Sequence, residues 1–541
     1  MTRPPNILWV SFEDTNPRYG CTGDPVARTP HLDRLAAQGC RWTHAFSTAG
    51  VCAPARAAVI TGMYATAIGA HHMRTSHVHG GAPDALPTPY SAVPPPYVKC
   101  FSEYLRAAGY YCTNNSKTDY QFDTPFTAWD VCGEFAHWRQ RPDPNQPFFA
   151  VFNPMRTHEA GMWEGREESP DAPDPAAILL PPYFPDTPKV RAAMARLYAN
   201  LAWCDRFLGD RLHELEEDGL ADNTIVCHWS DHGPLPRGKR WPYDSGIHVP
   251  LIVRWPGHVA PGSVNDDLVS TVDLGPTMLA LAGVPVPRHL HGRVFLGPRA
   301  APPRAHVFAS RDRHDESYDM VRAVRDRRFK YIRHFMPEQP YLAWTPYLNC
   351  HPIMQELWRL HLEGRLNAVQ SLLMSDRRPA EELYDTAHDP HEVRNLADDP
   401  AFAPHLQRLR EALDAWRREL GDWGDVPESE MVRRWYPDRR QPVTAPPLFV
   451  PISAASPGLA VASGRTALTG PARVLLHCPT QGASLGYTRE TGDAPRWRLY
   501  TGPIVLSAGE TTVRAKAIRI GYRESAESAA TFVVSAEHRN A

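Results

Sequence analysis

Long hydrophobic runs are missing from this chain of 541 residues. No stretch reaches the roughly 18 consecutive apolar residues of a membrane-spanning helix, so we expect no membrane anchor. The formal net charge of −2 has no basic excess, which argues against binding to nucleic acid or to a membrane surface. The apolar run at 6–12 is not followed by small residues typical of a cleavage site. We therefore expect a cytoplasmic protein, or a periplasmic or secreted one if a signal peptide has been removed.

Paired cysteines are also missing. The ten cysteines are scattered along the chain, without a C-x-x-C pair or a dense framework. This usage is typical of reduced, buried thiols rather than of a disulfide scaffold.

The pattern that is present favours an α/β fold. Short apolar runs predict strands at 6–12, 148–154, 223–233 and 250–257. Helical patterns predict helices at 30–39, 188–217 and 404–420. Strands that alternate with helices predict an α/β sandwich around a mainly parallel sheet. Ligands of such sheets bind at the carboxyl ends of the strands. The polar residues at these ends are Glu13, Asp14, His158, Asp231 and His232.

The length of the chain predicts two or more domains. We expect a large first domain over 1–425 and a connection over 426–454, which is rich in proline and tryptophan. From about 455 to 541 the sequence changes to short strands and turns with few helix formers, which predicts a smaller β-sandwich.

The stretch AGVCAPARAAVITG (49–62) places a cysteine just before a short helix. Pro54 suits the first helical turn and Gly62 suits the C-terminal end. Unpaired backbone N–H groups at the N-terminal end of a helix favour an anion, and Arg56 adds a positive charge one turn away. Cys52 is either a thiolate nucleophile in this setting or a small buried residue at a helix start.

The wider sequence decides between these readings. C-x-P-x-R followed by AAVITG, with NILWVSFEDT before it and SDHG after it, resembles the sulfatase family, which has the alkaline-phosphatase-like fold. The resemblance extends over roughly 5–420 and includes TPHLDRLAAQG, DLVSTVDLGPTML and ELYDTAHDPHEVRNLADDP. The tracts LLPPYFPDTPKVRAAMARLYANLAWCDRFLG and SDHGPLPRGK most resemble those of sulfamidases (heparan N-sulfatases) and related bacterial enzymes. In the tail, at roughly 455–536, the stretches ASLGYTRETGDAPRWRLYTGPIVL and TTVRAKAIRIGYRES resemble the C-terminal module of chitobiases. This resemblance implies an accessory or packing domain.

The resemblance implies that Cys52 is oxidised to formylglycine by a maturation enzyme. It also implies a divalent metal ion, calcium in most sulfatases, held by position 52 and by the strand-end residues Glu13, Asp14, Asp231 and His232. Two positions depart from the family pattern: most sulfatases have aspartate at the position of Glu13 and asparagine at that of His232. Because a histidine ligand is softer than an oxygen donor, manganese or zinc are alternatives to calcium.

The remaining catalytic roles follow from the same match. Arg56, Lys117 and Lys239 are expected to bind the sulfate group through charge-assisted hydrogen bonds. His158 matches the general acid that protonates the leaving group. Asp119 stands where the family has a histidine; it either adjusts Lys117 or contacts substrate, or it is a plain loop carboxylate.

Substrate recognition is assigned to the loop RDRHDESYDM (311–320). Arg311, Arg313 and His314 are expected to form a sugar-binding rim, with a solvated hairpin as the alternative. The stretch HHMRT (71–75) is expected to lie beside this loop.

We therefore expect a hydrolase that releases sulfate from an O- or N-sulfated sugar or small molecule. The alternatives are a phosphonate or phosphate ester hydrolase of the same fold, and an inactive carbohydrate-binding relative in which Cys52 stays a thiol. The sugar, the position of the sulfate, the metal and the oligomeric state stay open at this point.

Overall fold

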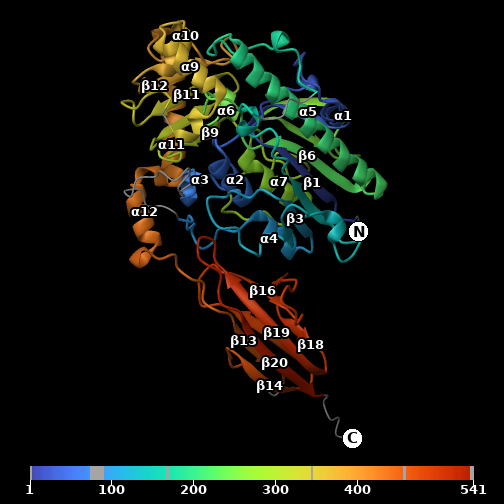
Figure 1. Cartoon of the computed structure of the whole chain (residues 1–541). Coiled ribbons are helices and arrows are strands. Elements are labelled where there is room, and N and C mark those ends of the chain that lie inside the picture. The colour runs from blue at the N-terminus through green and yellow to red at the C-terminus, as the bar shows by residue number, and fades with distance from the viewer. Residues whose placement is uncertain (1–2, 74–89, 166–169, 343–344, 455–457, 536–541) are drawn as a thin grey trace.

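A large central sheet organises the chain (Figure 1). The computed structural model describes residues 3–73, 90–165, 170–342, 345–454 and 458–535. Within these ranges, the sheet has eight strands. In spatial order they are β4 (Val131–Cys132), β3 (Tyr111–Asn115), β5 (Phe148–Phe152), β1 (Asn6–Phe12), β6 (Thr224–Ser230), β7 (Leu251–Arg254), β2 (Cys40–Phe46) and β8 (Ser263–Ser270). Only β7 among them runs antiparallel to its neighbours, so the expected mainly parallel sheet is confirmed.

Helices cover both faces of this sheet, because its strands are apolar on both sides. On β1, Leu8 and Val10 pack with the two helices of one layer, and Ile7 and Trp9 pack with those of the other. The first layer consists of α1 (Pro30–Gln38) and the long α5 (Pro188–Glu217). The second consists of α2 (Cys52–Thr61), α4 (Phe101–Ala107) and α7 (Leu274–Leu281). The chain is thus an α/β sandwich, as expected.

A second, antiparallel sheet follows the first. Its strands are β12 (Glu381–Asp385), β11 (Phe329–His334), β10 (Val321–Arg325) and β9 (Val307–Arg311) in spatial order. Helix α11 (Ala403–Leu420) packs against it through Leu406, Leu409, Leu413 and Trp416. The other helices of the main body are α3 (Ala65–Ile68), α6 (Asp244–Ile247), α8 (Pro346–Asn349), α9 (Pro352–Leu362) and α10 (Ala368–Ser371).

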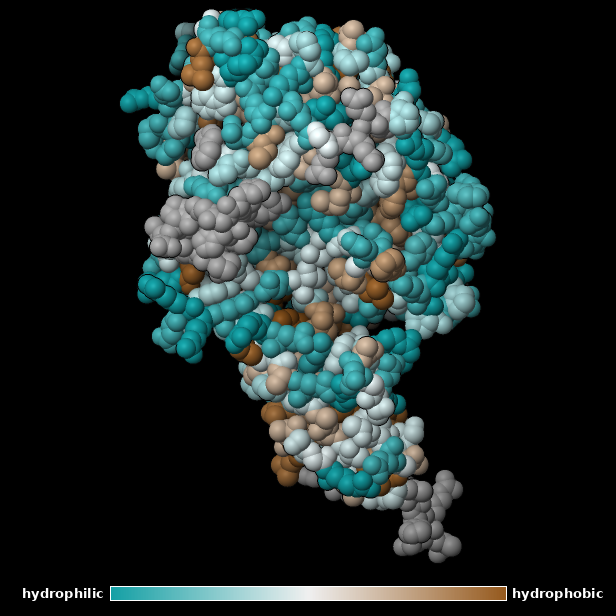
Figure 2. Space-filling model, in the orientation of Figure 1, coloured by the Kyte–Doolittle hydropathy of each residue, from teal (hydrophilic) through white to brown (hydrophobic). Residues whose placement is uncertain are grey.

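The C-terminal part forms a narrower lobe at one end of the molecule (Figures 1 and 2). One of its sheets contains β13 (Leu448–Ile452), β15 (Ala472–His477) and β18 (Ile504–Leu506). The other contains β14 (Gly464–Thr469), β20 (Ser528–Ser535), β19 (Gly509–Ile518), β16 (Ser484–Thr488) and β17 (Arg498–Leu499). A common apolar core that includes Phe449, Val474 and Phe532 lies between them, which is the arrangement of a β-sandwich.

The lobe is held to the main body by polar, cation–π and apolar contacts, since Ile520 packs into the main core. Lys99 donates hydrogen bonds to the carbonyl of Gly482 and to Ser484, at 2.6 and 2.8 Å. The ammonium of Lys516 lies 4.1 Å from the centre of the Phe126 ring. These contacts agree with a packing role for the lobe.

The expected connection over 426–454 contains regular structure. Helix α12 (Glu428–Trp435) lies in it, and Met431 and Trp435 pack into the main core. Its proline and tryptophan content suggested a linker, but the apolar residues of this short helix are spaced one turn apart and become buried. Strand β13 begins at its end and pairs with β15.

Two further properties concern the chain as a whole. All ten cysteines are free thiols, as expected. Among the described residues, no helix combines the length and the apolar character that crossing a bilayer requires. The cellular location of the protein stays a prediction.

Candidate active site

Cys52 is the first residue of α2, and all ten residues of this helix are buried. The helix ends at Gly62, whose φ of 66° lies in the left-handed region that glycine adopts without strain. The short apolar helix is therefore anchored in the core on every side. Its buried N-terminal end holds the Cys52 side chain in one place.

The residue pairs Glu13–Asp14 and Asp231–His232 meet near Cys52 because β1 and β6 are parallel neighbours. Phe12 lies opposite Ser230 at the ends of these strands, so the residues that follow them lie side by side. Asp231 accepts hydrogen bonds from the backbone N–H groups of Asp14 and His232, at 3.2 and 3.0 Å. Asp14 has a φ of 46°, a conformation that non-glycine residues rarely adopt. The tight crossing of the two loops fixes these side chains.

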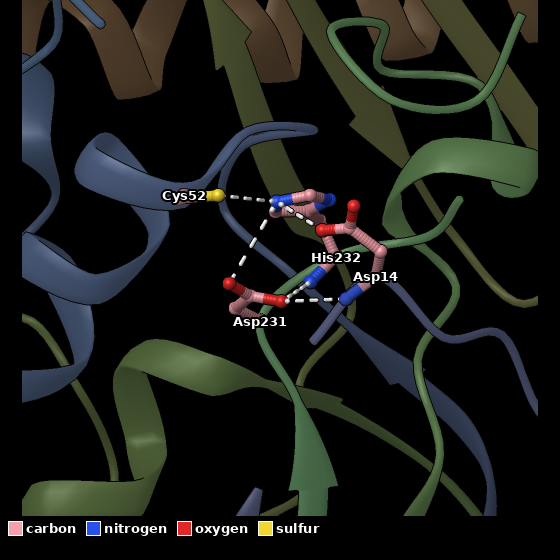
Figure 3. A group of neighbouring side chains, drawn as sticks. All are labelled: Asp14, Cys52, Asp231 and His232. Carbon is pink, nitrogen blue, oxygen red and sulfur yellow. Dashed lines mark hydrogen bonds and ion pairs between the residues drawn. The ribbon is translucent and has the colours of Figure 1, made fainter. Parts of the chain in front are cut away.

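The side chains of Asp14, Cys52, Asp231 and His232 converge on one point (Figure 3). Nε2 of His232 lies 3.2 Å from Sγ of Cys52, 3.4 Å from Oδ1 of Asp14 and 3.7 Å from Oδ2 of Asp231. All four are fully or almost fully buried. Oδ1 of Asp14 is buried without a hydrogen-bond partner among the described residues. Its contact with the imidazole of His232, at 3.4 Å, is an ion pair without hydrogen-bond geometry, so a bound cation would satisfy this oxygen better.

A metal ion fits this group. Its four ligand atoms lie within 4.8 Å of one another. Burial alone would lower the pKa of His232, but the charges of Asp231, Cys52 and Asp14 raise it to about 10. The protonated imidazole thus supplies positive charge where the acidic groups require a cation. A bound metal ion would displace the imidazole proton, and the mixed oxygen and nitrogen donors would then suit manganese or zinc as well as calcium.

Glu13, the fifth expected metal ligand, points to two cations instead. Its carboxylate forms ion pairs with Arg56 and with Lys117, the latter at 2.5 Å. Burial would raise the pKa of Glu13, but these two charges outweigh it and hold the pKa well below its usual range. Oε2 of Glu13 lies 3.9 Å from Sγ of Cys52. Glu13 therefore sits at the edge of the cluster, and its role as a ligand stays a prediction.

The three expected sulfate-binding cations surround the same cluster. Arg56 also contacts Asp231 at 3.1 Å. Lys117 lies 3.6 Å from Asp119, so Asp119 adjoins the lysine that it was expected to adjust. Lys239 contacts Asp14 at 2.7 Å. Each of these cations is paired with an acidic side chain, and cations grouped around one point are suited to hold an anion such as sulfate.

His158 follows β5 and begins a short 3-10 helix (Glu159–Met162). Its Nε2 lies 3.2 Å from Nζ of Lys239. Burial, followed by the charge of Lys239, lowers the pKa of His158 to about 4. The imidazole is therefore neutral at pH 7 in this state. A bound anion raises the pKa of a nearby histidine, so the expected role as general acid requires substrate and stays a prediction.

Sequence reasoning missed three residues of this site. Glu159 forms a two-pronged ion pair with Arg240, at 3.0 and 2.7 Å, and also contacts Lys239 at 3.1 Å. Asn153 accepts hydrogen bonds from Ser11 and Arg56, at 2.6 and 3.1 Å. The sequence could have indicated Asn153, because this residue directly follows the apolar strand β5 at the carboxyl edge of the sheet. Glu159 and Arg240 are sequence neighbours of expected site residues and carried no separate signal.

The expected sugar-binding rim is not an open surface. Arg311, Arg313 and His314 are all buried. Arg313 forms an ion pair with Glu428 of α12, at 2.7 Å, and Arg311 pairs with Asp319 at 3.1 Å. A buried guanidinium is stable only when it is paired, and these acidic partners are part of the fold. The polar loop is thus mainly a structural link rather than a rim.

The stretch next to this loop was placed correctly. The N–H of Met73 donates to the carbonyl of Arg313 at 2.8 Å, and Nδ1 of His72 accepts from the N–H of Arg313 at 3.2 Å. Residues 74 and 75 of the same stretch lie outside the described residues.

The pair between Arg313 and Glu428 predicts a large effect on stability. Glu428→Ala is expected to lower the free energy of unfolding by about 3–5 kcal/mol, because it removes the acidic partner of the buried Arg313 guanidinium. Urea denaturation measures this change. Glu430→Ala, on the same helix, is the control: Glu430 pairs with the exposed Arg434, so little change is expected, because solvent screens such pairs. Equal losses in both variants would contradict the structural role of Arg313.

Comparisons with known proteins agree with this site. The family model described as sulfatase matches residues 5–143 and 133–284, and the one described as N-sulphoglucosamine sulphohydrolase, C-terminal, matches 237–342. An ulvan-active sulfatase of Formosa agariphila is 40% identical over 560 residues, which covers 96% of this chain and 90% of that protein. The human N-sulphoglucosamine sulphohydrolase is 29% identical over 486 residues, or 80% of this chain and 94% of that protein.

The fold is shared with solved structures. One of them, a protein in complex with its substrate D-glucosamine-2-N,6-O-disulfate, has a TM-score of 0.55 and 18% identity, and the match covers 77% of this chain and 98% of that one. At this identity the likeness concerns the fold alone. The matches in sequence decide the family, and they confirm the resemblance that the motif around Cys52 indicated. The chain belongs to the sulfatase family of hydrolases.

Proposed function

We propose that the protein releases inorganic sulfate from a sulfated saccharide, using a formylglycine made from Cys52. The observation that carries the proposal is the buried group of Asp14, Cys52, Asp231 and His232, whose ligand atoms lie within 4.8 Å of one another. The relatives named above are sulfatases of sulfated carbohydrates, which supports a saccharide as the substrate. The particular sugar, and the choice between an O- and an N-sulfate, belong to the experiment below.

The roles of the residues follow from their contacts. Formylglycine in its hydrated form carries two hydroxyls, of which one attacks sulfur and the other later expels sulfate. A divalent metal held by Asp14, Asp231 and His232 would lower the pKa of the attacking hydroxyl and neutralise sulfate oxygens. Arg56, Lys117 and Lys239 hold the sulfate group by charge-assisted hydrogen bonds. A maturation enzyme must oxidise Cys52 beforehand.

Calcium, manganese and zinc differ in what they require of this group. Calcium usually takes six to eight oxygen ligands, whereas manganese and zinc accept imidazole nitrogen readily. The buried nitrogen of His232 beside Asp14 and Asp231 supports manganese or zinc as alternatives to calcium. Metal analysis of the purified protein distinguishes the three.

The direct test combines activity with the mass of one peptide. The wild-type protein is incubated with sulfated ulvan oligosaccharides and with N-sulfoglucosamine, and released sulfate is quantified by ion chromatography. The peptide that contains position 52 is expected to be lighter by one sulfur and two hydrogens and heavier by one oxygen. An unmodified Cys52 together with no sulfate release would favour an inactive relative. Faster turnover of an aryl phosphonate ester than of an aryl sulfate would favour the phosphonate hydrolase, which the curated relatives do not support.

The acid role of His158 predicts a difference between substrates. A sugar alcohol is a poor leaving group and needs a proton in the transition state, whereas nitrophenolate does not. His158→Ala is therefore expected to lower kcat on a sugar sulfate by about 10²–10⁴-fold and to affect 4-nitrophenyl sulfate far less. Steady-state kinetics on both substrates measure this.

His232→Ala provides the comparison, because its imidazole belongs to the metal group. It is expected to lower both rates together with the metal content. Equal losses on the two substrates in His158→Ala, with the metal content unchanged, would remove the acid role from His158.

A further inference from the structure

A groove of about 1010 Å³ lies beside the site, and of the residues that line it only His158 has been given a catalytic role so far. One wall is the loop after β5, and the other is a face of α5. The polar and aromatic residues that line it are Arg156, His158, Asp174, Arg196, Asn200 and Trp203. Its floor contains small residues of α5, so that the space along the helix is left unfilled.

The groove adjoins the catalytic cluster at His158. This histidine lines the groove and contacts Lys239 at 3.2 Å, and Lys239 in turn contacts Asp14 at 2.7 Å. A general acid must lie next to the atom that it protonates. If His158 protonates the leaving oxygen or nitrogen, the rest of the leaving saccharide lies on the side of His158. The groove is the space on that side.

Trp203 has the properties of a platform for a sugar ring. It is 41% exposed, so part of its ring is available for contact with a ligand. Its ring stacks on Phe207, with centroids 5.8 Å apart and planes at 21°, so that one face is held while the side chain still lines the groove. Aromatic rings that are rigid and partly exposed bind amphipathic ligands at a low cost in conformational entropy.

The charge of the groove suits an acidic saccharide. Two arginines line it against one aspartate. The exposed Arg156 lies two residues from His158, and Nε of Arg196 donates to the carbonyl of Met162 at 2.8 Å. The Asp174 carboxylate accepts the N–H of Ala176 at 2.9 Å and keeps its charge, so the two arginines exceed it by one positive charge. Arginine binds carboxylate and sulfate oxygens through paired N–H groups.

We propose that this groove binds the saccharide that carries the scissile sulfate, with Trp203 stacking on a sugar ring and Arg156 contacting a further acidic group. The inference rests on the proposed function, because it identifies the leaving group of that reaction. The ligand class is an oligosaccharide with sulfate or uronate groups. Binding energy from such remote contacts serves to orient the reacting group.

The first test compares two substrates of different size. With ulvan oligosaccharides, Trp203→Ala and Arg156→Ala are each expected to raise KM about tenfold, while the conservative Trp203→Phe retains most of the binding. With 4-nitrophenyl sulfate, which has one ring and no second acidic group, the effect is expected to be smaller. The ratio of kcat/KM between the two substrates should therefore fall about tenfold. Phe135→Ala is the control, because Phe135 is 87% exposed and does not line the groove.

The second test measures binding without turnover. Isothermal titration of the oligosaccharides into Cys52→Ala protein, with and without Trp203→Ala, is expected to give a Kd about tenfold weaker for the double variant. An unchanged ratio and an unchanged Kd would overturn the groove as a saccharide site even where the wild-type enzyme is active. A wild-type enzyme that releases no sulfate from the saccharides would instead contradict the proposed function.

Discussion

Replacement of Cys52 by alanine is expected to abolish sulfate release, with kcat falling by at least about a thousandfold. Alanine has no sulfur to oxidise, so neither hydroxyl of the proposed nucleophile forms. The cations around position 52 are unchanged in this variant, so we expect sulfate still to bind and substrate affinity to change much less than kcat. Ion chromatography of sulfate, with both a saccharide and an aryl sulfate as substrate, measures the loss.

The control separates catalysis from folding. Cys227 is fully buried on β6, and Cys227→Ala also removes one buried sulfur atom, at a position outside the site. This variant is expected to keep most of its activity. Thermal unfolding of both variants shows whether the fold is intact. More than about one per cent of wild-type activity in folded Cys52→Ala would exclude the proposed nucleophile.

Replacement of one carboxylate of the cluster by an amide is expected to remove the bound metal together with activity. Asp14→Asn and Asp231→Asn each replace a buried carboxylate of the cluster by a neutral amide, which donates less charge to a cation. We expect bound metal to fall by at least about tenfold, because even the loss of a residue that only hydrogen-bonds a metal ligand costs about 10–100-fold in metal affinity. Elemental analysis after dialysis measures the metal content per protein.

A matched variant tests whether any buried aspartate has this effect. Asp273 is buried and paired with Arg304, outside the cluster, so Asp273→Asn is expected to keep the metal. Full metal occupancy in both Asp14→Asn and Asp231→Asn would contradict the metal site.

Glu13→Gln resolves the position of the fifth expected ligand. Because its carboxylate pairs with Arg56 and Lys117, we expect the variant to keep most of the metal and to lose activity through misplaced cations. Metal loss equal to that of Asp14→Asn would instead make Glu13 a ligand.

Much of the site could be predicted from local sequence, for a physical reason. A buried parallel strand is a short apolar run, and its carboxyl end lies at the edge where ligands bind. Asp14 and Asp231 follow such runs, and Cys52, Pro54 and Arg56 lie at a helix start. The helical periodicity over 188–217 likewise predicted α5 with the bounds that the structure has. These features depend on neighbours in the sequence, which one chain displays directly.

The pairing of buried charges was decided by the tertiary structure alone. Arg313 and Glu428 are 115 positions apart, and only the packing of α12 on the core brings them together. A buried charge must find an opposite charge because desolvation is costly, but composition does not say which residue supplies it. For this reason the loop at 311–320 resembled an open rim in the sequence and is a buried ionic link in the structure.

The groove beside His158 also exists only in the folded chain. It forms because the loop after β5 and one face of α5 approach each other without filling the space between them. The sequence by itself determined the family, the fold class and the residues at the strand ends, since these follow from local pattern. Tertiary structure decided the partners of Glu13, the burial of Arg313 and the space next to His158, because each depends on how distant segments pack.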